Sequence, residues 1–96
     1  MTEQTGDPVR MHAFVSGVVQ GVNFRWFVER VGNRMKLAGW VRNLPDGRVE
    51  LEVEGPVQKV DDFLDEVGRG PLGSRVDSVI ASEKPPEGAV DFRIRF

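Results

Sequence analysis

The sequence predicts an α+β domain in which two helices pack on one face of a mainly antiparallel sheet. Two segments carry apolar residues at helical spacing, others alternate apolar and polar residues as strands do, and turn-forming residues separate them. The chain has 96 residues, which suits one small domain and is too short for two separate cores. We therefore expect one domain at residues 9–96, preceded by a flexible polar segment at residues 1–8.

The first strand and the first helix are expected on either side of a glycine-containing loop. Residues 9–16 alternate apolar and polar side chains, which predicts a strand with His12 near its middle. At such a position we favour a sheet-surface histidine over a catalytic one. From Phe24 to Met35 apolar residues recur at i, i+3, i+4, i+7 and i+11, which predicts an amphipathic helix. Gly39 is expected to end that helix.

A hairpin is predicted next, with a tight turn at Pro45-Asp46-Gly47 between strands at residues 40–43 and 48–54. Along the second strand the apolar residues face one side and the charged residues the other. We therefore expect one covered face of the sheet and one face open to water. The inward residues are Val49, Leu51 and Val53, and the outward residues are Arg48, Glu50, Glu52 and Glu54.

A second amphipathic helix is predicted at residues 56–68, because Pro56 suits its start and Gly68 its end. Strands are predicted to follow at residues 75–83 and 92–96. The resulting order is βαββαβ with a short terminal strand, which defines the split βαβ, or ferredoxin-like, arrangement.

Composition excludes several kinds of functional site. The chain has no Cys and one His, which rules out disulfides, thiolate zinc sites, cysteine nucleophiles and metal sites with several histidines. Its 13 Lys and Arg residues against 15 Asp and Glu residues give a net charge of −2, so no overall basic surface for nucleic acid is expected. The sequence contains no recognisable signal peptide or membrane span, and we expect a cytoplasmic protein.

The loop between the first strand and the first helix reads Gly-Val-Val-Gln-Gly-Val-Asn-Phe-Arg at residues 17–25. Its two glycines allow successive backbone N–H groups to form an anion-binding nest, and Arg25 adds a planar set of donors. The predicted topology brings this loop, the start of the helix and Asn43 to the same end of the sheet. A phosphate site fits these residues, and so does a glycine-rich turn with a surface arginine. The loop lacks the Gly-Lys-Ser/Thr of a P-loop.

Two spaced motifs resemble the signatures of the acylphosphatase family. Residues 17–25 resemble the first signature, Gly-x-Val-Gln-Gly-Val-x-Phe-Arg. Residues 39–49 resemble the second, Gly-aromatic-Val-basic-Asn-x-x-x-Gly-x-Val, and Gly55 stands where a later glycine is expected. The resemblance extends over essentially the whole of residues 9–96. One departure is Val18, which stands where many members carry a basic residue and makes the rim of the loop less positive.

This resemblance implies an enzyme that hydrolyses the anhydride between a carboxylic acid and phosphoric acid, with no metal and no cofactor. It implies that Arg25 binds the phosphoryl oxygens together with the loop amides, and that Asn43 orients the attacking water. The expected partner is a small-molecule acyl phosphate rather than nucleic acid or a membrane, and we expect a monomer. The loop amides are those of Val18, Val19, Gln20, Gly21, Val22, Asn23 and Phe24.

The chemistry of an acyl phosphate agrees with this small set of groups. A carboxylate leaving group has a conjugate-acid pKa of roughly 4 to 5, so it can depart without a general acid. Phosphoryl transfer through a loose transition state depends mainly on positioning and on charge stabilisation. Because the motifs offer no stronger base, an oxygen of the bound phosphoryl group is expected to accept the proton of the water.

Other residues near the motifs have simpler interpretations. The Gln20 side chain is expected to brace the loop, and Trp40 is expected to pack in the core. Arg42 and Arg48 are expected to be solvated strand charges. Trp26 lies off the apolar stripe of the helix and has no assigned role.

A different class of protein fits the same loop: a non-catalytic regulatory module that binds phosphate or another small anion. The sequence does not separate binding from turnover, so this alternative stays open. An RNA-recognition module is disfavoured, because the outward face of residues 48–54 carries Arg-Glu-Glu-Glu instead of aromatic side chains.

Overall fold

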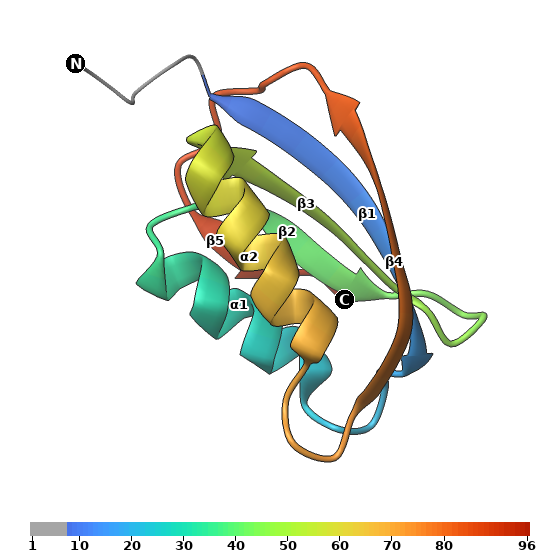
Figure 1. Ribbon diagram of the computed structural model, residues 1–96. Helices are drawn as coiled ribbons and strands as arrows, with labels where there is room; N and C mark the ends of the chain where they lie inside the picture. The colour runs from blue at the N-terminus through green and yellow to red at the C-terminus, as the bar shows by residue number, and fades with distance from the viewer. Residues whose placement is uncertain (1–7) are drawn as a thin grey trace.

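The computed structural model describes residues 8–96 and has the predicted ferredoxin-like α+β fold (Figure 1). Seven elements follow one another in the predicted order, with bounds within a few residues of those expected. The predicted flexibility of residues 1–8 falls almost wholly on residues 1–7, which lie outside the described residues. The elements are β1 (Val9–Val18), α1 (Phe24–Arg34), β2 (Ala38–Asn43), β3 (Val49–Gly55), α2 (Val57–Arg69), β4 (Arg75–Lys84) and β5 (Phe92–Ile94).

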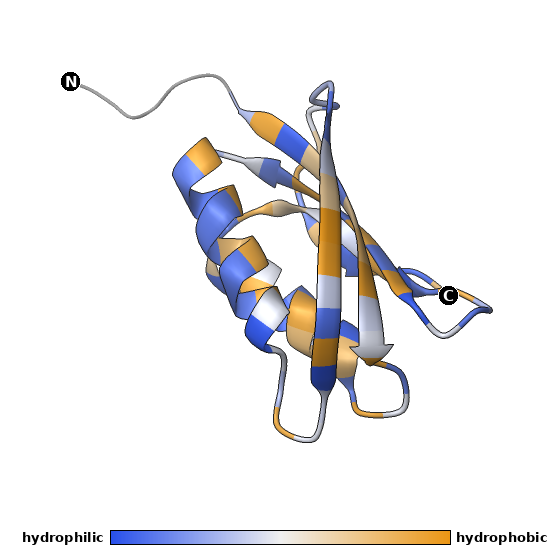
Figure 2. Ribbon diagram, turned by 45° about the vertical axis from the view of Figure 1, so that its right-hand side comes forward, coloured by the Kyte–Doolittle hydropathy of each residue, from blue (hydrophilic) through white to orange (hydrophobic). Residues whose placement is uncertain are grey.

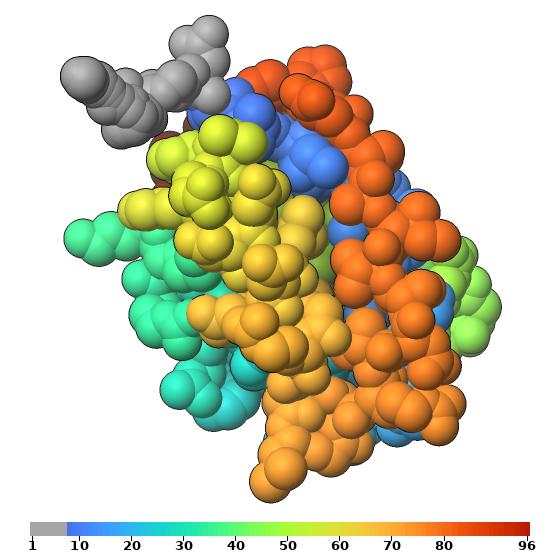
Figure 3. All heavy atoms as spheres, viewed as in Figure 1, coloured from blue at the N-terminus to red at the C-terminus, as the bar shows by residue number. Residues whose placement is uncertain are grey.

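The strands form one sheet in the order β4-β1-β3-β2-β5. Every pair is antiparallel except β2 and β5, which run parallel. Both helices cover the same face of the sheet, and apolar and polar residues alternate along the strands (Figures 1 and 2). In the space-filling view of Figure 3 the side chains of α2 lie between those of α1 and those of β4. The core therefore lies between the helices and one face of the sheet.

The opposite face, called here the outer face, is less open to water than the alternation in β3 suggested. Glu52 and Glu54 are each only 5% exposed. Arg10 donates from Nε to Glu52 Oε1 (2.6 Å) and from Nη1 to Glu54 Oε1 (2.9 Å), and Lys84 Nζ lies 2.8 Å from Glu52 Oε2. Burial alone would raise the pKa of Glu52, but hydrogen bonds from Lys84 and Arg10 outweigh it and lower that pKa. The expectation of a water-exposed face was wrong here because cations from β1 and β4 cover the carboxylates.

His12 lies on this outer face, as expected of a sheet-surface histidine. Its Nε2 lies 2.6 Å from Glu50 Oε2, and Arg42 donates from Nε to Glu50 Oε1 at 2.7 Å. Glu50 is 8% exposed, so it too is buried. Arg42 is itself exposed, which agrees with its interpretation as a solvated strand charge with a partner on the neighbouring strand.

Trp40 is buried, but the expectation that it packs in the core was wrong. It lies opposite Glu52 in the β2–β3 pairing and therefore on the outer face. The guanidinium carbons of Arg42 and Arg95 lie 5.4 and 4.4 Å from its ring. Cationic side chains cover the indole there, so its burial owes nothing to the helices.

Gly39 does not end α1, contrary to the expectation. The helix ends at Arg34, and Lys36 takes the left-handed conformation, with φ at 59°, that turns the chain toward β2. Gly39 lies within β2 with φ at 148°, and a Cβ there would lie 1.9 Å from the carbonyl oxygen of Glu52. Close approach of the neighbouring strand therefore accounts for this glycine.

Candidate active site

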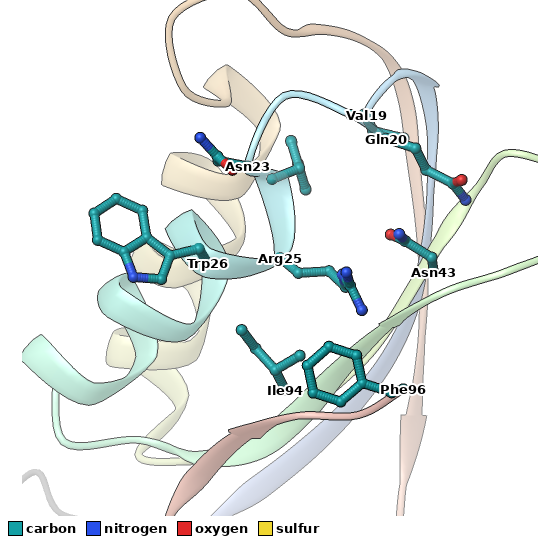
Figure 4. A pocket seen from close by; sticks show the side chains of 10 residues that line it. Val19, Gln20, Asn23, Arg25, Trp26, Asn43, Ile94 and Phe96 are labelled. Atoms are coloured by element: carbon teal, nitrogen blue, oxygen red, sulfur yellow. The ribbon is translucent and has the colours of Figure 1, made fainter.

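A pocket of about 360 Å³ opens at the end of the sheet where β1 meets α1 (Figure 4). The loop between β1 and α1, the first turn of α1, the last residue of β2 and the C-terminal segment form its walls. The predicted topology brought the loop and Asn43 to one end of the sheet, and the pocket lies there. Its lining residues are Val19, Gln20, Gly21, Asn23, Phe24, Arg25, Trp26, Asn43, Ile94 and Phe96.

The loop wraps the pocket because two of its residues adopt left-handed backbone conformations. Gly21 has φ at 75°, and Asn23 has φ at 60° where α1 begins. The Asn23 side chain makes no capping hydrogen bond. Within residues 8–96, none of the backbone N–H groups of residues 20–24 donates a hydrogen bond to another residue. These amides, together with the positive end of the helix dipole, leave the pocket rich in donors.

Two residues of the predicted phosphate loop do not line the pocket. Val18 is the last residue of β1, pairs with Arg75 of β4 and is 44% exposed. Val22 is half-buried and packs against the core. The side chains of these two valines therefore face other parts of the molecule, whereas Val19, Gln20, Gly21, Asn23 and Phe24 come together at the pocket.

Arg25 lies in the first turn of α1, and its side chain crosses the pocket toward Asn43 (Figure 4). Its Nη1 donates to the carbonyl oxygen of Arg95 at 3.4 Å, and the guanidinium carbon lies 4.9 Å from the centre of the Phe96 ring. Among residues 8–96 no carboxylate pairs with it. One long hydrogen bond and one stacking contact leave most of its five N–H groups for a ligand.

Asn43 is the last residue of β2 and lies opposite Val49 of β3. Its side-chain oxygen Oδ1 is buried and accepts no hydrogen bond from any described residue. A buried acceptor without a partner is costly, so such an atom in a pocket indicates a place where a bound molecule donates to it. Water and the hydroxyl groups of a ligand are suitable donors.

The Gln20 side chain braces the loop, as expected. Its Nε2 donates to the carbonyl oxygen of Leu44 at 2.8 Å and to that of Arg48 at 2.9 Å. The loop is thereby fastened to the turn between β2 and β3. Arg48 pairs with Asp46 within that turn and stacks on Phe14, so it remains a surface charge as predicted.

Sequence reasoning missed the C-terminal wall of the pocket. Ile94 and Phe96 line it, and Phe96 lies under the guanidinium of Arg25 although the two are 71 positions apart. The alternation at residues 92–96 predicted a strand but gave no sign of what its last residue touches. Trp26, which had no assigned role, also lines the pocket, with Arg30 stacked 4.6 Å from its ring.

Free backbone amides, a helix N-terminus and a guanidinium with unused donors can together hold one compact oxyanion. The fold and the pocket thus define a class of protein: a small ferredoxin-like domain with an anion site at the start of its first helix. Among residues 8–96 no group of three or more His, Asp or Glu side chains could hold a metal ion. Nor is any helix of the described chain long and apolar enough to cross a membrane.

Comparison with known proteins narrows this class to one family. The acylphosphatase family model matches residues 11–94. A protein of Moorella thermoacetica named acylphosphatase is 48% identical over 87 residues, which cover 91% of this chain and 94% of that protein. An acylphosphatase of Koribacter versatilis is 53% identical over 73 residues, covering 76% of this chain and 66% of that one. The chain belongs to the acylphosphatase family, whose members hydrolyse acyl phosphates (EC 3.6.1.7).

A solved structure shows the same fold. The crystal structure of acylphosphatase from Bacillus subtilis superposes with a TM-score of 0.89 at 39% identity, and the match covers 92% of this chain and 99% of that one.

Proposed function

We propose that this chain hydrolyses acyl phosphates by in-line attack of a water held by Asn43 on a phosphoryl group bound by Arg25 and by the backbone amides of the 18–24 loop. Residues 9–96 form the whole of this functional unit. The observation that carries the proposal is that the unused donors of Arg25 and the unpartnered Oδ1 of Asn43 share one pocket.

Phosphoryl binding uses N–H groups that are mostly unpaired within the described residues. The amides of residues 20–24 make no other hydrogen bond, and Arg25 has no carboxylate partner within residues 8–96. In a loose transition state negative charge spreads over the three non-bridging oxygens of the phosphoryl group. A curved row of N–H groups with a planar guanidinium opposite it stabilises that charge without reorganising.

Asn43 is suited to hold the nucleophile because its buried oxygen is a hydrogen-bond acceptor to which no described residue donates. A water that donates a hydrogen bond to Oδ1 keeps a lone pair free to point at phosphorus. Attack on that line forces the acyl oxygen to leave from the opposite side of the phosphoryl group. The new bond joins the water oxygen to phosphorus, and the bond from phosphorus to the acyl oxygen breaks with its electrons passing to the carboxylate.

One of the two protons of the attacking water passes to a phosphoryl oxygen, and the other stays on the oxygen that is now bound to phosphorus. The single histidine supplies no base here, because His12 lies on the outer face, pairs with Glu50 and does not line the pocket. The carboxylate leaves unassisted, since its conjugate acid has a pKa of roughly 4 to 5. The products are a carboxylate and inorganic phosphate.

The test is the release of phosphate from benzoyl phosphate by the purified chain in the presence of a metal chelator. Turnover well above the spontaneous rate is expected. No release above the spontaneous rate would favour the rival role of a non-catalytic anion-binding module.

Asn43→Ala tests the assignment of the water. Turnover is expected to fall by about a hundredfold, the scale of losing one positioning contact. Inorganic phosphate should still inhibit competitively with little change in its inhibition constant, because the amide serves the water rather than the phosphoryl group. An Asn43→Ala variant with normal turnover would remove this role.

We also propose that the chain acts as a monomer in the cytoplasm. Cross-strand ion pairs between Arg10, Lys84 and the β3 glutamates satisfy the charges of the outer face within one copy of the chain. The outer face therefore does not require a second copy to pair its charges.

A further inference from the structure

We infer that Gln20 is a positioning residue for catalysis: its side chain holds the turn after Asn43 against the phosphoryl-binding loop and so determines where the attacking water stands. The inference rests on the roles proposed above for Asn43 and the loop. One side chain would then couple the loop that binds the phosphoryl group to the segment that carries Asn43.

The contacts of Gln20 join the loop between β1 and α1 to the turn between β2 and β3. Gln20 belongs to the loop between β1 and α1, whereas its two acceptors, the carbonyls of Leu44 and Arg48, lie at the two ends of the β2–β3 turn. The same turn is closed by a hydrogen bond from the Leu44 N–H to the Arg48 carbonyl at 2.8 Å. The carboxamide of Gln20 therefore holds both ends of the turn from the side of the anion site.

These bonds leave the side chain of Gln20 without an N–H for the substrate, whereas its backbone N–H stays free. A carboxamide has two N–H groups, and the two short bonds at 2.8 and 2.9 Å use both of them. The Gln20 side chain thus cannot donate to a phosphoryl oxygen while it grips the turn. Any effect of these two N–H groups on catalysis therefore passes through the residues that they hold.

Asn43 is the residue that depends on this grip. Its side chain makes no hydrogen bond within residues 8–96, so its position follows from the backbone that carries it. The ladder between β2 and β3 ends at the pair of Asn43 and Val49, and the next residue, Leu44, is held by Gln20. A shift of Leu44 would carry the Asn43 side chain with it, and a displacement of about 1 Å can cost a hundredfold in rate.

A merely structural role would lower stability without separating turnover from phosphate binding. The test therefore uses Gln20→Met, which keeps the length of the side chain and removes both donors. With benzoyl phosphate, kcat is expected to fall by roughly ten- to a hundredfold. The inhibition constant of inorganic phosphate should change by less than about threefold, because the substitution removes none of the N–H groups that bind phosphate. Gln58→Met is the matched control, since Gln58 is exposed on α2 and, among residues 8–96, its side chain bonds only to Asp62.

The decisive measurement is a double-mutant cycle. If Gln20 acts through Asn43, adding Gln20→Met to Asn43→Ala causes no further loss of kcat. Losses that multiply in the double variant would overturn the inference, as would a rise in the phosphate inhibition constant that matches the loss in kcat/KM. If Gln20→Met does not fold, Gln20→Asn, whose shorter side chain cannot span both carbonyls, goes through the same cycle.

The cycle also distinguishes a failure of the inference about Gln20 from a failure of the proposed function. Normal turnover in Asn43→Ala would overturn the proposed role of Asn43, and the inference about Gln20 with it. A slow Asn43→Ala variant beside a fully active Gln20→Met variant would overturn the inference about Gln20 and leave the proposed function standing.

Discussion

Replacing Arg25 with Lys keeps the positive charge of the site and removes the planar arrangement of its donors. In the structure the guanidinium is held by Phe96 at 4.9 Å from its ring centre and by the Arg95 carbonyl at 3.4 Å. The planar guanidinium is therefore oriented toward the pocket before a ligand arrives. A lysine ammonium is a point charge on a flexible chain and cannot donate two parallel hydrogen bonds to one phosphoryl group.

The size of the loss follows from the contacts. One of the two charge-assisted hydrogen bonds from Arg25 to the phosphoryl group is lost, which costs about 1.5–3 kcal/mol. Losing the stacked, preset geometry over Phe96 adds about 0.5–1 kcal/mol. The sum is about 2–4 kcal/mol of transition-state stabilisation, and at about 1.4 kcal/mol per factor of ten this lowers kcat/KM by roughly thirty- to a thousandfold.

Initial rates of phosphate release from benzoyl phosphate measure this loss, with Arg30→Lys as the matched control. Arg30 lies farther along the same helix and stacks on Trp26 at 4.6 Å, so its replacement changes charge geometry outside the anion site. The Arg30→Lys variant should retain near-normal kcat/KM. If Arg25→Lys were as active as the wild type, the guanidinium would have no part in binding the phosphoryl group and the reasoning above would fail.

Two further predictions concern stability. The pKa of Glu52 is lowered in the folded state, so the unfolded chain takes up the proton first as the pH falls. The free energy of unfolding should therefore decrease below about pH 4.5. Urea titrations should show a flatter acid limb, meaning a smaller loss of stability below that pH, in Glu52→Gln and an unchanged one in the exposed-site control Glu83→Gln. An acid limb as steep in Glu52→Gln as in the wild type would contradict this. Gly32→Ala should destabilise the fold by about 1–2 kcal/mol, because a Cβ there lies 2.6 Å from the Phe92 ring and overpacking outweighs the better helix propensity. In Gly68→Ala the nearest atom is 3.9 Å away, so no loss is expected, and equal stabilities of the two variants would refute the packing argument.

The sequence was sufficient to predict the fold and the meeting of the loop with Asn43, because both depend on order and periodicity. Alternation in the strands, helical spacing in two segments and a Pro-Asp-Gly turn define the βαββαβ order. That order alone brings the start of the first helix and the end of the second strand to one edge. The roles of Arg25 and Asn43 at that edge are still predictions, and the variants above test them.

What the sequence could not predict depends on contacts between distant residues. Alternation in β3 indicates which face Glu52 is on, but Arg10 and Lys84, 42 and 32 positions away, decide whether that face is wet. Trp40 follows the same rule, since its face is set by the pairing and its burial by Arg42 of the same strand and by Arg95, which follows β5. Likewise, no local pattern could reveal that Phe96 lies beneath the guanidinium in the pocket.

The outer face of the sheet and the pocket at its end use charge in opposite ways, and the difference explains how a chain of this composition supports a binding site. On the outer face Arg10 and Lys84 form ion pairs with glutamates, which largely neutralise their charges within the fold. At the pocket, within residues 8–96, Arg25 and the amides of the loop have no counter-charge. Leaving donors unpaired normally costs stability, but the first amides of any helix are unpaired in any case. An anion site at that position therefore costs the fold little, and a chain with no cysteine and one histidine can build it almost entirely from its backbone.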